Sequence, residues 1–495
     1  MGKFTKKILI RISEHVSPAM VAMILVAIIS GILLFVPPIN GLGDTGDFYR
    51  AMNSNGIYRL PSNHSQFMSY IVTKFGIYQY FNENHAVVVS TQTLFVHMAL
   101  FLNKLFYSKT IFDIRFMGLV WYLFYLGAIY LLTKSLVYPH HNLVSYVIAL
   151  IVVFILGDSS FTLYFNSFFG EPEMFIATIY SFAAIMLLAR QCTKRRWPVI
   201  ILFFVSTILL ITSKQQNAPL ALSFSVVAIG LVFLPGFKAR RLAVIVGMGC
   251  LLISGIVIYA SINKDFTSYN TYQAFSYGAL METNDPSKKI DKQGVNEQYA
   301  LMRSQAYYSK TFDAVKPTSK NITKKLTSKM NIVWFVKYYL HNRQQFINLM
   351  DLAAKDVMIT QVKSVGDYTR GAGHKPNEQV RYFTLYSSYL SAFYPGRFAF
   401  VCLTAIGFVA VYAVGAYRDF RSRRFHGILR FLLVVGLMTI FVFVPIISIL
   451  GDGEADLAKH MFMAPLSFDL AVILFISDML NKQLWNTDEG GDANA

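Results

Sequence analysis

The chain has 495 residues, of which 55% are hydrophobic and only 15% are charged, and its mean hydropathy is +0.45. Several apolar runs are long enough to cross about 30 Å of hydrocarbon, so the composition predicts a polytopic membrane protein. The net charge of +18 does not indicate nucleic-acid binding. The basic residues cluster beside apolar runs, where the positive-inside rule and anionic lipid account for them.

The apolar runs predict helices. They are rich in Leu, Ile, Phe and Val without the alternation of a barrel strand, and helices satisfy every backbone group in lipid without closing a barrel. The three cysteines lie far apart and form no Cys-x-x-Cys pair, so neither a disulfide framework nor a zinc site is indicated. We expect an all-α bundle of about eleven transmembrane helices. The apolar segments lie near 16–36, 86–106, 116–136, 143–157, 174–190, 198–213, 218–234, 242–261, 397–416, 428–449 and 461–480.

The basic residues predict the orientation of the chain. Basic residues precede the first run and follow later ones, which places these segments in the cytoplasm. They are Lys3, Lys6, Lys7 and Arg11, and the clusters at 194–196, 238–241 and 418–424. The tail after Asn481 is predicted to be cytoplasmic as well.

The same reading divides the chain into three parts. Residues 1–262 are predicted to be an N-terminal transmembrane catalytic module, whose first external loop, 38–85, contains short interfacial helices. Residues 263–395 hold no spanning run and are predicted to be a large extracytoplasmic loop or domain. Residues 396–495 supply the last transmembrane helices and the short tail.

One segment gives conflicting predictions. Counting forward from a cytoplasmic N-terminus gives three crossings before Asp158, which places Asn166 and Glu171 inside. Counting backward from the basic cluster at 194–196 places them outside. We prefer the backward count, because the spans within 86–157 are the shortest. A partial or re-entrant helix there reconciles the two counts.

The candidate site begins at the stretch Gly43–Arg50, which follows the first span and holds two carboxylates. Asp47 precedes the aromatic pair Phe48–Tyr49, which can anchor it at the interface, and Gly46 lets a substrate approach the backbone. We therefore expect Asp47 to be the general base. Asp44, the second catalytic candidate, can instead cap the turn or bind an acceptor hydroxyl. As an alternative, these acids are ordinary solvated charges just beyond a span.

Other charged and polar residues are predicted on the same outer face. Carboxylates there can serve as a general base, and Lys and Arg can bind a phosphate leaving group. The candidates for the donor phosphate are Lys214, Arg50, Lys459 and His460. The candidates for substrate binding are Asn166, Glu171, Asp452 and Glu454. The alternatives are a snorkelling Lys214, a Glu171 that only complements a helix N-terminus, and an ordinary loop at Lys459–His460.

Several sequence motifs are missing. The chain has no G-x-x-x-x-G-K-[ST], no H-E-x-x-H and no G-x-S-x-G. The predicted cytoplasmic loops are too short to house a nucleotide-sugar domain. An activated sugar would therefore arrive on a lipid, and the chemistry would take place on the outer face.

The short motifs resemble a known superfamily. Asp47–Arg50 after the first span, Arg115 opening a later one, the segment 164–172 and Thr212–Lys214 closing a span are similar to GT-C superfamily glycosyltransferases. More narrowly, three motifs resemble bacterial glycan-biosynthesis hexosyltransferases of WsfD type. They are Gly46–Arg50, Asn166–Pro172, and Gly451–Glu454 with Lys459–His460. Residues 263–395 contribute nothing to the resemblance.

The resemblance implies a GT-C-like bundle and a polyprenyl-phosphate sugar donor, with an acid of the first external loop as base. It also implies a glycan or wall-polymer acceptor at the surface of a bacterial plasma membrane. It fixes neither sugar nor acceptor, implies no certain cofactor, and leaves a divalent metal ion open.

Two other functions compete. A transporter or flippase of lipid-linked glycans predicts charges within spans, whereas this chain keeps them mostly at span ends. A glycan polymerase of the O-antigen type shares the large external loop. However, that polymerase family has an Arg followed eleven positions later by a Gly, and this pattern is missing from 263–395.

Overall fold

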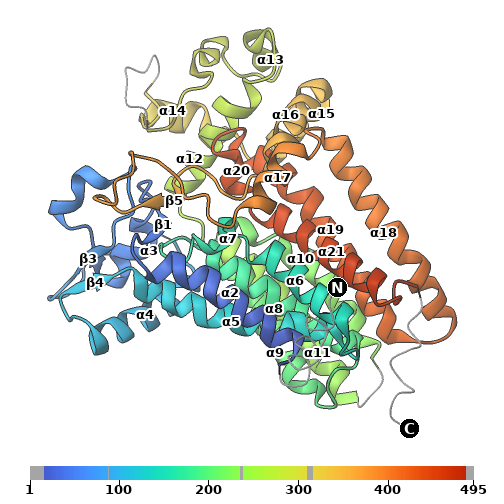
Figure 1. Cartoon of the computed structure of the whole chain (residues 1–495). Coiled ribbons are helices and arrows are strands. Elements are labelled where there is room, and N and C mark those ends of the chain that lie inside the picture. Colours follow the sequence, from blue (N-terminus) through green and yellow to red (C-terminus); the bar gives the residue numbers. More distant parts are fainter. Residues whose placement is uncertain (1–15, 87, 235–237, 309–315, 486–495) are drawn as a thin grey trace.

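A computed structural model describes residues 16–86, 88–234, 238–308 and 316–485. The predicted cytoplasmic cations Lys3, Lys6, Lys7 and Arg11, and residues 486–495 of the tail, lie outside the described residues. The described chain is mostly helical (Figure 1) and confirms the predicted all-α polytopic membrane protein.

Within the described ranges, eight helices are long and apolar enough to span a membrane. They are α2 (Pro18–Phe35), α5 (Arg115–Val137), α8 (Glu171–Ala189), α9 (Arg196–Ser213), α11 (Lys238–Ala260), α18 (Phe398–Arg421), α19 (Phe425–Asp452) and α21 (Met463–Leu480). Two shorter apolar helices, α6 (Leu143–Leu156) and α10 (Leu220–Val232), pack among them. With α4 (Gln92–Phe106), which corresponds to the predicted segment 86–106, each of the eleven predicted segments coincides with a helix.

Helix α8 lies at the centre of the bundle. Of its most apolar stretch 89% is buried, and it packs against α5, α9 and α19. The helix begins as its sequence predicts, with Pro172 in the first turn and Glu171 and Glu173 beside it. The start of α8 is therefore fixed at one end of the bundle.

Helix α4 begins and ends at the same face of the bundle. Next to its first residue, the Thr91 N–H donates to the Thr212 carbonyl near the end of α9, at 3.2 Å. Near its last turn, the Asn103 Oδ1 accepts from the Asp113 N–H, just before α5, at 2.9 Å. Only α5 and α6 then separate the first loop from Asp158, which places both on one face. This arrangement reconciles the forward and backward counts.

The bundle therefore has two distinct faces. We call the one that carries the first loop the site face, formed by residues 38–90, 157–170, 214–217, 263–308, 316–396 and 453–460. The opposite one, the basic face, is formed by residues 138–142, 190–195, 422–424 and 481–485 and by the adjoining first turns of α9, α11 and α19.

The long segment 263–395 forms small elements that gather at the site face (Figure 1). They are α12 (Lys264–Ala274), the π-helical turn Phe275–Ala279, α13 (Pro286–Asp291), α14 (Lys320–Lys325), α15 (Ile332–His341), α16 (Arg343–Asp356), β5 (Val365–Tyr368) and α17 (Leu385–Phe393). Helix α12 packs against α19. The predicted boundaries at 262 and 395 stay a prediction, but the middle segment is packed on the bundle.

Two small sheets hold the first loop in place. Strand β1 (Asn40–Leu42) pairs antiparallel with β5, so that Gly41 lies opposite Asp367. The other sheet has the order β2 (Ile57–Tyr58), β3 (Lys74–Ile77) and β4 (Ile111–Asp113). The short helices predicted for 48–84 are α3 (Tyr49–Met52) and the 3-10 turns at 53–55 and 61–66. Strand pairing thus adds to the predicted helices and joins the first loop to the large loop.

The segment between α6 and α8 joins the large loop to the bundle. It contains the short helix α7 (Ser159–Thr162), which the Asp158 side chain caps by accepting from the Ser160 N–H at 3.0 Å. The other Asp158 oxygen accepts from the Ser387 N–H of α17 at 2.9 Å. The polar segment between α6 and α8 therefore holds α17, which lies more than two hundred positions later in the sequence.

We predict that the two ends of α4 are accessible from the same side of the membrane. In a background with Cys192, Cys250 and Cys402 replaced by Ser, Asn84→Cys and Lys109→Cys should both react with an impermeant maleimide added to intact cells. Both positions are exposed at the site face.

Arg423→Cys at the basic face is the matched control, and it should react only after the membrane is permeabilised. Labelling of Asn84→Cys and Lys109→Cys from opposite sides would mean that α4 crosses the bilayer.

Candidate active site

A cavity of about 580 Å³ lies at the site face, and stretches of chain far apart in the sequence line it. They include the first loop, the starts of α4, α8 and α15, the turn after α9, the end of α11, and the segment from the end of α19 to α20 (Leu457–His460), with α12 closing one side. Seven of the predicted site residues line this cavity. They are Asp47, Arg50, Glu171, Lys214, Asp452, Lys459 and His460.

Asp47 lies between two cations. The Lys459 Nζ is 2.5 Å from Asp47 Oδ2, and an Arg50 guanidinium nitrogen is 3.0 Å from Asp47 Oδ1. Burial opposes ionisation of Asp47, but Lys459 and Arg50 outweigh it and hold its pKa below the ordinary value. Asp47 is therefore a carboxylate at neutral pH, with its proton affinity suppressed by its partners.

Lys214 pairs with the acid at the start of α8. Its Nζ is 3.1 Å from Oε1 of Glu171, whose side chain is almost completely buried. Lys214 follows the last residue of α9 and lines the cavity, close enough to Asp47 to lower that group's pKa further. The side chain of Lys214 is thus held in the cavity by a carboxylate, which is unlike a residue that snorkels to water.

Aromatic side chains form the wall behind the cations. Lys459 Nζ lies 4.8 Å from the centre of the Phe169 ring, and the Arg50 guanidinium lies 4.7 Å from that of Phe266. Phe48, which is fully buried, packs against Phe169 at 5.6 Å between ring centres. Ring faces attract cations, so this wall helps to keep Arg50 and Lys459 in the cavity.

His460 is a neutral hydrogen-bonding group. Its Nδ1 is 3.1 Å from Gln216 Oε1, and its Nε2 is 3.6 Å from Asp452 Oδ2. Burial, with Lys214 and Lys459 nearby, lowers the pKa of His460 to about 3. At neutral pH the imidazole therefore adds no positive charge, and it can meet a phosphate only through hydrogen bonding.

Asp44 lies outside the cavity lining. Its side chain is 1% exposed, and its two oxygens are 2.6 and 3.0 Å from Nε and a terminal nitrogen of Arg59. The Gly46 N–H donates to Asp44 Oδ1 at 2.9 Å. This is the turn-capping alternative that the sequence left open, and it directs Asp47 toward the cavity.

Two substrate-binding candidates also lie outside the cavity lining. Asn166 is fully buried, and its Nδ2 donates to the carbonyls of Leu34 and Asn40, at 3.1 and 2.9 Å. Glu454 follows the end of α19, and its N–H donates to the Tyr277 carbonyl at 2.9 Å. Asn166 therefore fixes the end of α2 to the segment before α8, and Glu454 fixes the large loop to the end of α19.

Arg115 belongs to a neighbouring ionic cluster. It pairs with Asp113 at 2.6 Å, and Lys74 pairs with the same carboxylate oxygen at 2.6 Å. None of these three residues is part of the cavity lining. Arg115, the first residue of α5 and part of the GT-C resemblance, thus stabilises the strands beside the site.

The cavity also contains residues that sequence reasoning missed. Helix α12 contributes Phe266, Tyr269 and Asn270 from a segment in which no motif was recognised. Burial, together with Asp452 and Asp47, raises the pKa of Tyr269 to about 12, so its hydroxyl stays protonated. Asp456, in a left-handed backbone conformation with φ of 46°, also lines the cavity. No periodicity or motif in the sequence marks α12 as part of this site.

The arrangement can bind an anion and accept a proton. Arg50, Lys214 and Lys459 can hold a phosphate, and Asp47 is a carboxylate beside them. Among the described residues, no group of three or more His, Cys, Asp or Glu side chains is placed to hold a metal ion.

Comparisons with solved structures find distant similarity. The apo oligosaccharyltransferase of Archaeoglobus fulgidus is 13% identical, with a TM-score of 0.38 over 92% of this chain and 50% of that one. The AglB oligosaccharyltransferase of the same organism, in complex with an inhibitory peptide and a dolichol-phosphate, is 14% identical over the same shares, with the same TM-score. The chain thus spans about half the length of these structures.

No curated protein matches the chain. A family model described as the YfdI N-terminal transmembrane domain matches residues 3–494, which is nearly the whole sequence. This family is a different one from the WsfD-type hexosyltransferases that the motifs resemble. The chain belongs to the family of YfdI N-terminal transmembrane domains.

Proposed function

We propose that this protein is an inverting membrane glycosyltransferase of GT-C type. It moves a hexose or related sugar from a polyprenyl-phosphate carrier to a glycan or wall-polymer acceptor at the outer face of the plasma membrane. The observation that supports this most is the convergence of Arg50, Lys214 and Lys459 with the Asp47 carboxylate in one cavity.

The distribution of charge supports an extracytoplasmic site. The clusters at 194–196, 238–241 and 418–424 lie at the basic face, opposite the cavity. The positive-inside rule assigns such clusters to the cytoplasm. The site face then lies outside, where neither nucleotide sugars nor ATP are supplied and a lipid-linked sugar is a suitable donor.

The lining of the cavity suits a donor with a lipid tail. Its polar part lies at Lys214, Arg50 and Lys459, and its apolar part is formed by the ends of two spanning helices. The apolar residues from α19 and from the end of α11 are Val444, Ile447, Leu450, Tyr259 and Ile262. A phosphate can bind the cations while the isoprenoid chain packs along the helix ends.

The reaction follows from this placement. The acceptor hydroxyl oxygen attacks the anomeric carbon, and its proton passes to an Asp47 carboxylate oxygen. The bond between the anomeric carbon and the phosphate oxygen breaks, and the lipid phosphate leaves with the electron pair and with inversion. Lys214, Lys459 and Arg50 offset the charge that develops on the leaving phosphate.

The ion pair of Asp47 also affects its basicity. In the resting site Lys459 and Arg50 suppress the proton affinity of Asp47. A donor phosphate attracts the same cations, and each contact it takes from Asp47 raises that proton affinity again. The carboxylate therefore becomes a better base when the donor is bound.

A transporter or flippase, or a polymerase of lipid-linked glycans, is the alternative function. A transporter needs a polar path that connects the two faces. Within the part of the chain that the structure describes, the cavity at the site face and a second cavity at the basic face share no lining residue. This separation favours an enzyme with one substrate site.

We predict that Lys214→Ala weakens binding of a polyprenyl-phosphate hexose by roughly 1.5–3 kcal/mol, the usual contribution of a charge-assisted hydrogen bond. Purified protein titrated with a panel of such donors measures the change. Lys109→Ala, an exposed lysine at the same face outside the cavity, is the matched control and should bind the donor normally. An unchanged affinity in Lys214→Ala would remove Lys214 from the donor site.

We predict that Asp47→Asn lowers turnover about 10²- to 10⁴-fold, because it keeps the shape of the side chain and removes the base. The measurement is transfer from a polyprenyl-phosphate hexose to candidate acceptors, with donor binding and thermal stability followed in parallel. Near-normal turnover in Asp47→Asn would contradict the mechanism, and transfer by no member of the panel would contradict the proposed donor class.

Asp44→Asn should act on stability instead. Losing the charge-assisted hydrogen bonds to Arg59 should destabilise the folded protein by about 1.5–3 kcal/mol and lower its thermal midpoint. The folded fraction of Asp44→Asn should lose less turnover than Asp47→Asn. If the Asp44→Asn protein is stable but inactive, Asp44 rather than Asp47 is the base.

A further inference from the structure

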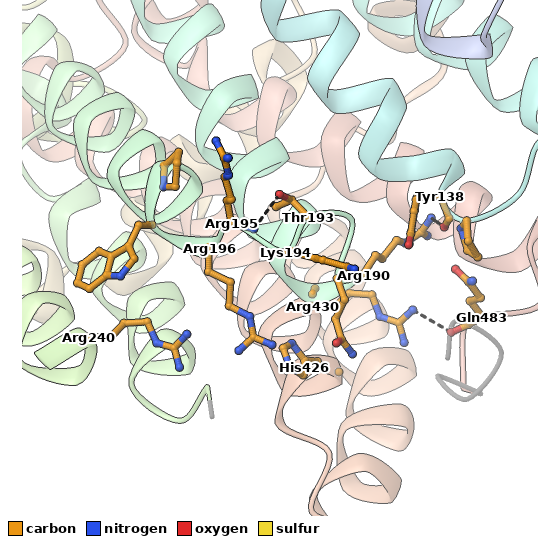
Figure 2. Close-up of a pocket in the computed structure, with 16 residues that line it drawn as sticks. Tyr138, Arg190, Thr193, Lys194, Arg195, Arg196, Arg240, His426, Arg430 and Gln483 are labelled. Carbon is orange, nitrogen blue, oxygen red and sulfur yellow. Dashed lines mark hydrogen bonds between the residues drawn. The ribbon is translucent and has the colours of Figure 1, made fainter. Parts of the chain in front are cut away.

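A second, larger cavity of about 930 Å³ lies at the basic face, at the opposite end of the bundle from the candidate active site. Among the described residues that line it, six are cations and none is acidic. The cations are Arg190, Lys194, Arg195, Arg196, Arg240 and Arg430. They come from the turn between α8 and α9, from the first turns of α9 and α11, and from the second turn of α19 (Figure 2).

Two of these arginines depend on the same buried carboxylate. Arg190 and Arg430 share one buried carboxylate, that of Asp478, at 2.5 and 3.1 Å. The buried Nε of Arg190 has no acceptor among the described residues. An anion bound between the guanidinium groups of Arg190 and Arg430 would supply the acceptor that this nitrogen lacks.

Two further arginines gather on the other wall. Arg196 and Arg240 lie close enough for their charges to repel each other. Both charges also interact electrostatically with the His426 imidazole. Figure 2 shows Arg196 and Arg240 directed toward His426, with Arg430 and Arg190 on the other side. Guanidinium groups from separate helices thus surround one space, and planar guanidinium groups suit phosphate oxygens.

The apolar surface beside the cavity indicates what carries the anion. Trp197, in the first turn of α9, lines the cavity and is 48% exposed. Ile201 and Val205 follow it four and eight residues later on the same side of α9, and both are exposed. Trp is typical of the membrane interface, and the two aliphatic residues continue the stripe along a spanning helix.

We propose that this cavity binds the phosphate headgroup of an anionic membrane phospholipid, whose acyl chains lie along the Trp197–Val205 stripe of α9. Basic pockets between transmembrane helices on the cytoplasmic side are suited to such headgroups. The proposal does not depend on the proposed glycosyl transfer, since the two cavities share no residue.

The test compares two double variants of the full chain. Lys194→Gln with Arg196→Gln removes two cations from the cavity. Arg418→Gln with Arg421→Gln removes two exposed cations near the same face, outside the cavity lining, and is the matched control. Native mass spectrometry measures binding of phosphatidylglycerol, phosphatidylcholine and free glycerol phosphate to each purified protein.

We expect the wild-type protein to bind phosphatidylglycerol at least about tenfold more tightly than phosphatidylcholine or glycerol phosphate, because its phosphate meets several cations and its lipid tail meets the apolar stripe. The cavity variant should lose roughly thirtyfold in affinity, and the control should stay within about twofold. Equal losses of affinity in both variants would mean that general surface charge, and not the cavity, attracts the lipid. Equal binding of glycerol phosphate would make the ligand a soluble anion, and equal binding of phosphatidylcholine would remove the need for a net negative charge. Each of these results overturns the proposal.

A second measurement does not depend on the folding of a charge variant. Phosphatidylglycerol carrying a spin label near its headgroup should quench Trp fluorescence in the wild-type protein. The quenching should fall in Trp197→Phe, which removes the tryptophan of the cavity. Quenching that is unchanged in Trp197→Phe would show that the lipid binds elsewhere.

Discussion

The salt bridge between Lys459 and Asp47 is the interaction on which the candidate site depends. It joins the first loop to the last loop, 412 positions apart in sequence. Arg50 completes the pair from the first loop, and Lys214 is held nearby by Glu171. In a partly buried cavity each charge needs a partner, because an isolated buried charge is costly. A phosphate that enters the cavity can therefore replace these carboxylates as the partner of the cations.

The bilayer explains why the polar chemistry collects at the ends of the bundle. Backbone and charged groups cannot remain unpaired in hydrocarbon, so the spanning segments are apolar helices and the ionic groups follow at their ends. Lys214 directly follows α9, Glu171 begins α8 and Asp452 ends α19. At the other end, Arg190, Arg196 and Arg240 occupy equivalent places. One architecture thus supports a mixed-charge cavity on one face and a positive cavity on the other.

Much of the candidate site was predictable because span ends are visible in the sequence. Asp47 and Lys214 follow an apolar run and Lys459 precedes one, and hydrophobicity with the positive-inside rule assigns them to one face. The functions of Asp44 and Asn166 were less visible. Their side chains are buried by tertiary contacts with Arg59 and with the end of α2, and no local pattern reports such contacts. The same applies to α4, whose apolar composition resembles a span although both of its ends lie at one face.

By itself, the sequence determined the membrane class, the eleven helical segments and the distribution of charge, because these follow from local hydrophobicity and the cost of burying charge. The tertiary structure alone decided which polar residues share a cavity. Helix α12 enters the candidate site from a segment without a motif, because packing against α19 carries Tyr269 there. The suppressed proton affinity of Asp47 and the neutral state of His460 also depend on neighbours distant in sequence. Burial and charge act through space, and only the folded chain fixes those distances.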